Sequence, residues 1–205
     1  IYDDLGQPQQ AIEFYQQSLD IRLDIGHREV EEMSLGNLGN AYMDAGDSQR
    51  AIDLHQQSLA VARNIGARRG EAMALYNIGN IYGEIGRAKD AIAPLQEALE
   101  IQRELQNDQD IATSLWSLGF QYKTLKEYDL ALQNYEQQLE VSQRIKDRSG
   151  EACAMANIAS VYKATQQYDL ALEYSHKEIE IARLIEDRER EAKALNRIGN
   201  IYKNL

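Results

Sequence analysis

The chain has 205 residues, and its 22 lysines and arginines are outnumbered by 33 aspartates and glutamates, so its formal net charge at pH 7 is −11. This acidity disfavours nucleic acid as a partner, because binding to a phosphate backbone depends on clustered cations. No apolar run approaches the roughly eighteen residues that a membrane span needs, and Cys153 is the single cysteine, which excludes an internal disulfide. We therefore expect a soluble protein in a reducing compartment, with the cytoplasm as the default.

The sequence repeats itself every forty residues. The stretch Leu75–Tyr82 contains Gly79, and the equivalent positions hold Gly39, Gly119, Ala159 and Gly199. Two further series keep the same step, a tyrosine three residues after the glycine and an alanine nine residues after that: Tyr2, Tyr42, Tyr82, Tyr122, Tyr162 and Tyr202, then Ala11, Ala51, Ala91, Ala131 and Ala171. A fixed period between twenty and fifty residues indicates a solenoid of repeated units.

The first predicted elements are a helix that follows the turn Gly6-Gln7-Pro8 and a pair of antiparallel helices within residues 28–65. Pro8 suits a first helical position, where its missing N–H costs nothing. One apolar stripe defines the next helix: Leu35, Leu38, Gly39 and Tyr42. Gly46 is placed to end this helix, and Asp47 or Ser48 to cap the following one. One face of that second helix carries the following residues: Ala51, His55, Ser58, Leu59 and Ala62.

Later units repeat this pair with local changes. Pro94 lies inside the helix that begins near Arg87, where it removes one backbone hydrogen bond, so we expect that helix to bend. Lys126 and Gln166 replace the turn glycine, and a non-glycine residue in the left-handed region costs about 1–2 kcal/mol. We therefore expect these two turns to differ slightly in shape from the glycine turns.

The forty-residue register predicts an all-α solenoid over residues 1–205, without an interdomain linker. We assign a half unit to residues 1–26, full units to about 27–66, 67–106, 107–146 and 147–186, and a half unit to 187–205. Because the sequence opens and closes at equivalent points of the repeat, we expect it to be a fragment of a longer array.

The run Leu-x-x-Leu-Gly-x-x-Tyr, present at 35–42 and 75–82 and followed by Gly46 or Gly86 and by Ala51 or Ala91, resembles the tetratricopeptide repeat (TPR). The usual unit of that family has about 34 residues, and the wording NLGNAY and NIGNIY looks like the forty-residue subclass of Pins/LGN-type G-protein-signalling modulators and bacterial multidomain regulators. The resemblance covers the whole chain and implies a right-handed superhelix of antiparallel helix pairs.

The resemblance also implies that the first helix of each pair lines a concave groove that holds a partner peptide. On the helical wheel this face changes along the chain from asparagine and methionine, through aromatic, to basic. The candidate groove residues are Asn37, Asn40, Tyr76, Asn77, Asn80, Trp116, Phe120, Lys123, Asn157, Lys163, Lys193, Arg197 and Asn200.

This composition predicts the kind of partner. Aromatic and arginine side chains supply most of the energy at many interfaces, and asparagines can hold an extended backbone, so we expect a protein segment with acidic and apolar residues. Chaperone-binding members of the family clamp a terminal carboxylate. Asn157, Lys193 and Arg197 match that clamp, but Trp116 and Phe120 stand where its first lysine and asparagine belong, so we do not expect chaperone tails.

No glycine-rich phosphate loop, metal-ligand cluster or nucleophile with its base is present, so we expect no catalysis, metal or cofactor. We interpret His27, His55 and His176 as satisfied core or surface residues, and Cys153 as an inert small residue. The predicted function is a protein-interaction scaffold or adaptor. Two alternatives remain open: a regulatory or sensor region that controls a fused effector domain in cis, and a spacer array that self-associates end to end.

Overall fold

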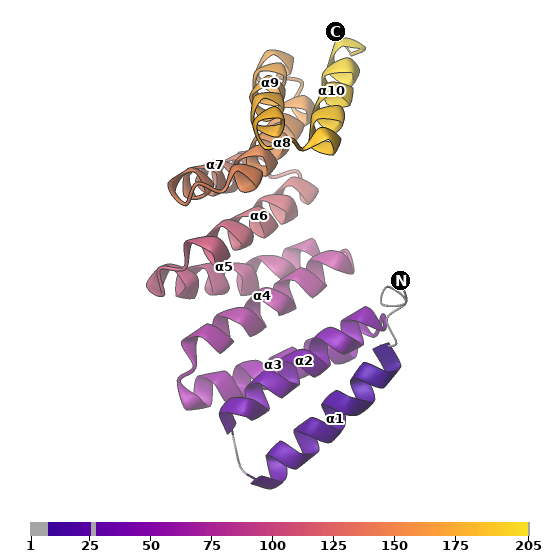
Figure 1. Cartoon of the computed structure of the whole chain (residues 1–205), viewed down its shortest axis with the longest axis vertical. Coiled ribbons are helices and arrows are strands. Elements are labelled where there is room, and N and C mark those ends of the chain that lie inside the picture. Colours follow the sequence, from indigo (N-terminus) through magenta and orange to yellow (C-terminus); the bar gives the residue numbers. More distant parts are fainter. Residues whose placement is uncertain (1–7, 26–27, 205) are drawn as a thin grey trace. The chain divides into compact units, whose positions relative to one another are not determined.

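The computed structural model describes residues 8–25 and 28–204. Over these residues the chain consists of α-helices joined by short turns, with no strand among them (Figure 1). The helices are α1 (Pro8–Ile25), α2 (Arg28–Asp44), α3 (Ser48–Ile65), α4 (Arg68–Glu84), α5 (Ala88–Glu104), α6 (Asp108–Thr124), α7 (Tyr128–Arg144), α8 (Arg148–Ala164), α9 (Tyr168–Leu184) and α10 (Arg188–Tyr202). The predicted all-α fold is confirmed.

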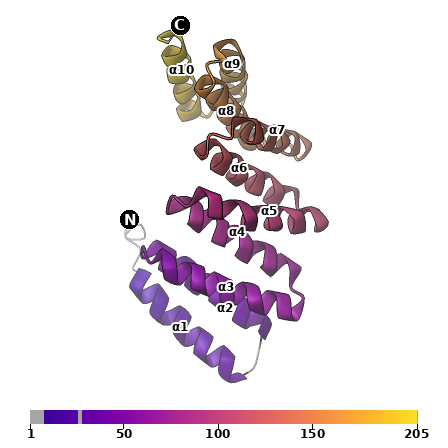
Figure 2. The same ribbon diagram turned by 180° about the vertical axis from the view of Figure 1, so that it is seen from behind.

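The chain divides between Leu105 and Gln106 into two compact units, which we call the N-terminal unit (α1 to α5) and the C-terminal unit (α6 to α10). In each unit, helices that follow one another in sequence pack side by side (Figure 2). Even-numbered helices, the first helices of the repeat, begin at residues 28, 68, 108, 148 and 188, and odd-numbered helices, the second helices, begin at 8, 48, 88, 128 and 168. The forty-residue register therefore holds for every described helix. The grouping of both units into one array and the hand of its superhelix remain predictions.

A small residue on each first helix makes room for the second helix. In three pairs a glycine faces a large side chain: Gly39 with His55, Gly79 with Leu95, and Gly119 with Tyr135. A Cβ atom added at Gly119 would lie 2.6 Å from the Tyr135 ring, which is too close for a real contact. In the fourth pair the glycine is replaced by Ala159, and the equivalent residue of the second helix is the small, fully buried Ser175.

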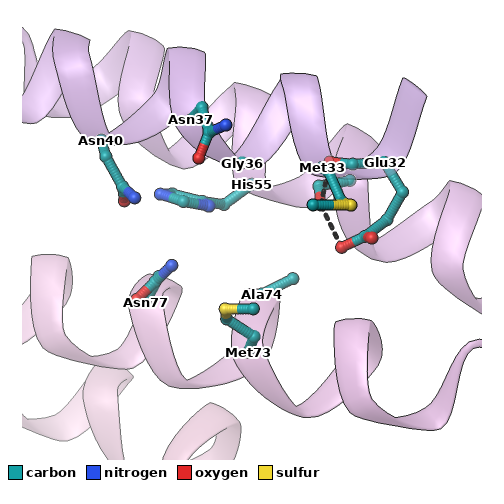
Figure 3. A pocket seen from close by; sticks show the side chains of 10 residues that line it. Glu32, Met33, Gly36, Asn37, Asn40, His55, Met73, Ala74 and Asn77 are labelled. Atoms are coloured by element: carbon teal, nitrogen blue, oxygen red, sulfur yellow. Dashed lines mark hydrogen bonds between the residues drawn. The ribbon is translucent and has the colours of Figure 1, made fainter. Parts of the chain in front are cut away.

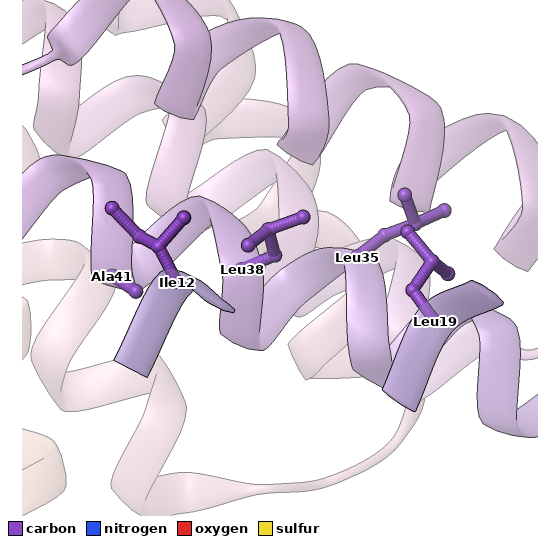
Figure 4. Packing of buried hydrophobic residues seen from close by; sticks show 5 residues of the cluster. All are labelled: Ile12, Leu19, Leu35, Leu38 and Ala41. Carbon is purple, nitrogen blue, oxygen red and sulfur yellow. The ribbon is translucent and has the colours of Figure 1, made fainter. Parts of the chain in front are cut away.

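Apolar side chains complete the packing between neighbouring helices. In the N-terminal unit, Ile12 and Leu19 from α1 contact Leu35, Leu38 and Ala41 from α2 (Figure 4). Each of these five side chains is at most 6% exposed. Burying a leucine or isoleucine stabilises a fold by about 1.5–3 kcal/mol, so contacts of this kind hold each helix to the next.

The turns inside the helix pairs have one geometry despite different residues. Gly46 and Gly86 have φ of 82° and 77°, and Lys126 and Gln166 have φ of 62° and 60°. In all four turns the left-handed residue donates its N–H to the carbonyl three residues earlier, and the next residue donates to the carbonyl five residues earlier. The predicted difference in shape is therefore confined to about 20° in φ.

The ends of the helices confirm further predictions and add one feature that the sequence analysis missed. Pro8 is the first residue of α1, whereas Gly6 and Gln7 lie outside the described residues. The Asp47 carboxylate caps α3 by accepting from the backbone N–H of Arg50 at 3.2 Å. The links between pairs also contain a left-handed residue: Gly66, Gln106, Lys146 and Glu186. Helix α5 continues through Pro94, and a bend there remains a prediction.

Candidate binding faces on the first helices

The predicted groove residues are distributed over both units. Five of them lie on α2 and α4 of the N-terminal unit: Asn37, Asn40, Tyr76, Asn77 and Asn80. Eight lie on α6, α8 and α10 of the C-terminal unit: Trp116, Phe120, Lys123, Asn157, Lys163, Lys193, Arg197 and Asn200. Each unit therefore presents its own candidate face, with its own chemistry.

In the N-terminal unit, α2, α3 and α4 enclose a pocket of about 80 Å³, which we call the amide pocket (Figure 3). Three predicted residues, Asn37, Asn40 and Asn77, line it, whereas Tyr76 and Asn80 do not. Its other lining residues are Glu32, Met33, Gly36, His55, Ser58, Met73 and Ala74. The polar residues Glu32, His55 and Ser58 were not predicted to have a binding role.

His55 lines the amide pocket, and in Figure 3 its ring lies next to Asn40, below Asn37 and above Asn77. The side chain is 1% exposed, and neither Nδ1 nor Nε2 has a hydrogen-bond partner in the described part of the chain. Burial lowers the pKa of His55 to about 4, so the ring is neutral at pH 7. His55 is thus a core residue, as predicted, and no described group of the chain satisfies its ring nitrogens. His176 is exposed, and His27 lies outside the described residues.

Glu32 is the second buried polar group of the amide pocket, and it is 9% exposed. Ser58 Oγ lies 3.3 Å from Glu32 Oε1, to which it donates, and 3.1 Å from the Glu32 carbonyl oxygen. Burial raises the pKa of the Glu32 carboxyl. All four equivalent positions in the other first helices hold alanine: Ala72, Ala112, Ala152 and Ala192. A comparison of the repeats with one another would have identified Glu32 from sequence.

In the C-terminal unit, two aromatic side chains project from α6. The rings of Trp116 and Phe120 are stacked, with their centroids 6.2 Å apart and their planes at 25°. They are 39% and 47% exposed, respectively. The prediction that Trp116 belongs to the surface and not to the core is therefore confirmed.

Most cations of the C-terminal face already have partners within the chain. Lys123 Nζ donates to Ser160 Oγ at 2.6 Å, and burial together with the charge of Arg197 lowers the pKa of Lys123. The Arg197 guanidinium donates to the buried carboxylate of Glu178. Lys193 forms an exposed ion pair with Glu189 at 2.6 Å. The expected basic region is present, but part of its charge is neutralised internally.

Two further residues of the C-terminal face are neutral, and Lys163 is a half-buried cation on α8. Asn157 Nδ2 donates to the Sγ atom of the half-buried Cys153 at 3.7 Å, and Asn200 is exposed on α10. Across residues 8–25 and 28–204, no three histidine, cysteine, aspartate or glutamate side chains are grouped so that they could hold a metal ion. None of the described helices combines the length and apolar character required to cross a membrane.

Comparison with known proteins gives matches to one family. Models of the tetratricopeptide repeat match residues 30–104 and 110–183, and a second such model matches residues 1–29. None of the curated proteins compared matches the sequence.

Solved structures with low sequence identity have the same fold. The chain is similar to a STAND signal-transduction ATPase with a tetratricopeptide repeat sensor from Pyrococcus horikoshii (TM-score 0.86, 16% identity), covering 97% of this chain and 30% of that one. It is also similar to the apo form of RapI (TM-score 0.84, 20% identity), covering 98% of this chain and 78% of that one. A third similar structure is BtubC from P. vanneervenii (TM-score 0.82, 18% identity), covering 97% of this chain and 84% of that one.

Proposed function

Because this chain belongs to the tetratricopeptide repeat family, we propose that it is a protein-interaction scaffold or adaptor whose first helices bind a segment of a partner protein. The observation that carries this proposal is the stacked, exposed pair of Trp116 and Phe120 on α6. Two large aromatic rings in contact with water are a typical anchor for a partner side chain, because covering them removes apolar surface from solvent.

The surroundings of the aromatic pair support a partner segment with apolar and acidic residues. Lys123 lies one turn further along α6, and Lys163 holds the equivalent position on α8. The Lys163 side chain has no hydrogen bond or ion pair with any other described residue, so its ammonium group can meet a carboxylate of the partner. Asn157 offers an amide for the backbone of an extended segment.

The test is affinity capture from a lysate with covalent cross-linking, using the full chain and two double variants. Trp116→Ala with Phe120→Ala removes the aromatic pair, and the matched control, Leu130→Ala with Leu184→Ala, removes two exposed leucines from second helices of the same unit. A partner that is lost from the aromatic variant and kept by the control supports the proposal. Capture of the same partners by all three proteins, or of none by any, contradicts it.

The choice of variants follows from the internal ion pair. Reversing the charge of Arg197 would leave the buried Glu178 carboxylate without its cation, and the resulting loss of stability would be confused with a loss of binding. Trp116 and Phe120 are uncharged and partly exposed, so their truncation leaves no buried charge unpaired and should preserve the fold. Equal helicity of the three proteins, measured by circular dichroism, confirms this point.

A regulatory region acting in cis is a second candidate function. The similar structure from Pyrococcus horikoshii uses a tetratricopeptide repeat as the sensor of a larger ATPase, of which the matched part is 30%. If this chain works in that way, the same face binds a domain of its own protein. Attaching the flanking sequence should then protect Trp116 from modification by a water-soluble reagent. Unchanged reactivity of Trp116 would contradict a regulatory role in cis.

End-to-end self-association is a third candidate, favoured by the surface of α10. Leu195 is 50% exposed, although its equivalents Leu35, Leu75 and Leu115 are buried. No atom lies within 4 Å of a Cβ built at Gly199, which has the position of Gly119 in the repeat. A second helix from another copy, such as α1, would fit this surface. Light scattering at several concentrations tests for this self-association. A chain that stays strictly monomeric would contradict it.

A further inference from the structure

The amide pocket of the N-terminal unit contains two buried polar groups that the repeat does not require. Glu32 stands where every other first helix has alanine, and His55 stands where the other second helices have Tyr15, Leu95, Tyr135 and Ser175. Leaving a buried polar group without a partner costs about 1–3 kcal/mol. The two departures from the repeat face the same cavity, so they are best explained together.

The amide pocket offers several hydrogen-bond acceptors to a ligand. The Glu32 carboxylate accepts one side-chain hydrogen bond, from Ser58, and no described cation lies within 4.0 Å of it. The neutral ring of His55 has one acceptor nitrogen, whichever tautomer it adopts. The side-chain oxygens of Asn37, Asn40 and Asn77 add further acceptors. A charged carboxylate in such surroundings favours a ligand that donates several N–H groups and carries positive charge.

The C-terminal unit shows this arrangement already completed by the chain itself. Glu178 and Arg197 occupy the positions that Ser58 and Asn77 have in the N-terminal unit, three repeats earlier. There the Arg197 guanidinium donates to the Glu178 carboxylate, whose side chain is 1% exposed. In the N-terminal unit the carboxylate comes from Glu32, beside Ser58, while Asn77 is a neutral amide and supplies no cation. One unit thus fills this space with its own arginine, and the other leaves it open.

We propose that the amide pocket binds a cationic N–H donor, the guanidinium or ammonium group of a basic side chain in the bound segment or of a free small cation. The first of these sources, a basic side chain in a bound protein segment, rests on the proposed function. The cavity of about 80 Å³ is larger than one water molecule requires. Met33 and Met73, both more than half exposed at its mouth, provide flexible apolar contacts for the methylene stem of the ligand.

The binding test uses the full chain and three probes: methylguanidinium, the neutral acetamide, and a blocked Ala-Arg-Ala tripeptide. Binding is followed through the ring ¹⁵N chemical shifts of His55 and by calorimetry. We compare the unsubstituted chain with Glu32→Ala, which restores the residue of the other repeats, and with Glu84→Ala. This control removes the same charge from an exposed position of α4. Both variants should fold, since alanine is an accepted residue at each helical position.

Methylguanidinium should bind the unsubstituted chain and Glu84→Ala equally, and at least tenfold more weakly to Glu32→Ala, while acetamide should bind all three weakly. Equal binding of methylguanidinium to Glu32→Ala, or binding of acetamide as tight as that of methylguanidinium, would overturn the proposal. If the tripeptide binds more tightly than methylguanidinium, a segment is the natural source of the cation, and equal affinities assign the pocket to a free small cation.

The outcomes for this pocket and for the proposed function are separable. Methylguanidinium binding that depends on Glu32 would stand even if no protein partner were captured through Trp116 and Phe120. A partner captured through the aromatic pair would stand even if Glu32→Ala left methylguanidinium binding unchanged.

Discussion

The two units share one helical framework, but the buried Glu32 of the N-terminal unit and the buried Glu178 of the C-terminal unit have different partners. In the C-terminal unit, the Glu178 carboxylate is paired with Arg197 from the next first helix. In the N-terminal unit, Glu32 has only a serine hydroxyl, and His55 has no hydrogen-bond partner in the described part of the chain. The residues that repeat every forty positions therefore build the scaffold, and the residues that depart from the repeat give each unit its own binding chemistry.

The largest effect is expected from breaking the internal pair of the C-terminal unit. Arg197→Ala leaves the Glu178 carboxylate buried without a cation, which should lower the free energy of unfolding by about 3–5 kcal/mol. Urea denaturation measures this change. Adding Glu178→Ala, the residue found at the equivalent Ala98, should restore most of the stability. Lys193→Ala, which breaks the exposed pair with Glu189, should cost less than about 1 kcal/mol.

The next effect concerns the unpaired histidine of the N-terminal unit. The unfolded chain protonates His55 near its ordinary pKa of 6.5, but the folded chain does so only near pH 4. Between these values the unfolded state binds more protons, so stability decreases by up to about 3 kcal/mol as the pH is lowered from about 6.5 to 4. His55→Leu, which copies Leu95, should remove this part of the pH dependence. Identical pH profiles for both proteins in urea denaturation would contradict the assignment.

A smaller effect should come from the glycine that faces Tyr135. Gly119→Ala places a Cβ atom 2.6 Å from the tyrosine ring, and such overpacking should destabilise the C-terminal unit by about 1–3 kcal/mol. Gly199→Ala is the matched control, because no atom lies within 4 Å of its added Cβ. Thermal unfolding should show that this control is neutral, or more stable by up to about 1 kcal/mol through helix propensity.

The smallest effect distinguishes the turns of the two units. The left-handed residues of the N-terminal unit are Gly46, Gly66 and Gly86, among the described turns, whereas all those of the C-terminal unit carry side chains. Lys126→Gly should relieve strain and stabilise the chain by about 0.5–1 kcal/mol, and Gly86→Ala should destabilise it by about 1 kcal/mol. Equal and opposite shifts in the urea midpoint would confirm that the turns share one geometry.

The sequence was sufficient to predict the framework, because periodic residues report on packing that recurs. The forty-residue step placed every described helix, and Gly46 marked a turn. The position of Trp116 indicated a surface, because the other repeats hold Gly36, Tyr76, Ala156 and Asn196 there. The pairing of Arg197 with Glu178 was not predicted, since it depends on how a side chain of α10 reaches across to α9. The missing partners of His55 also required atomic positions, whereas Glu32 was readable in principle as a glutamate in an alanine series.

The most direct test of the difference between the units is to transfer the C-terminal arginine to the N-terminal unit. Asn77 has the position of Arg197 in the repeat, so in Asn77→Arg the new guanidinium should reach the Glu32 carboxylate and fill the amide pocket. Calorimetry with methylguanidinium, together with urea denaturation, should then show that binding is lost and that stability is unchanged or higher. If Asn77→Arg still binds methylguanidinium as the unsubstituted chain does, the pocket is not the counterpart of the Glu178 site and the account is wrong.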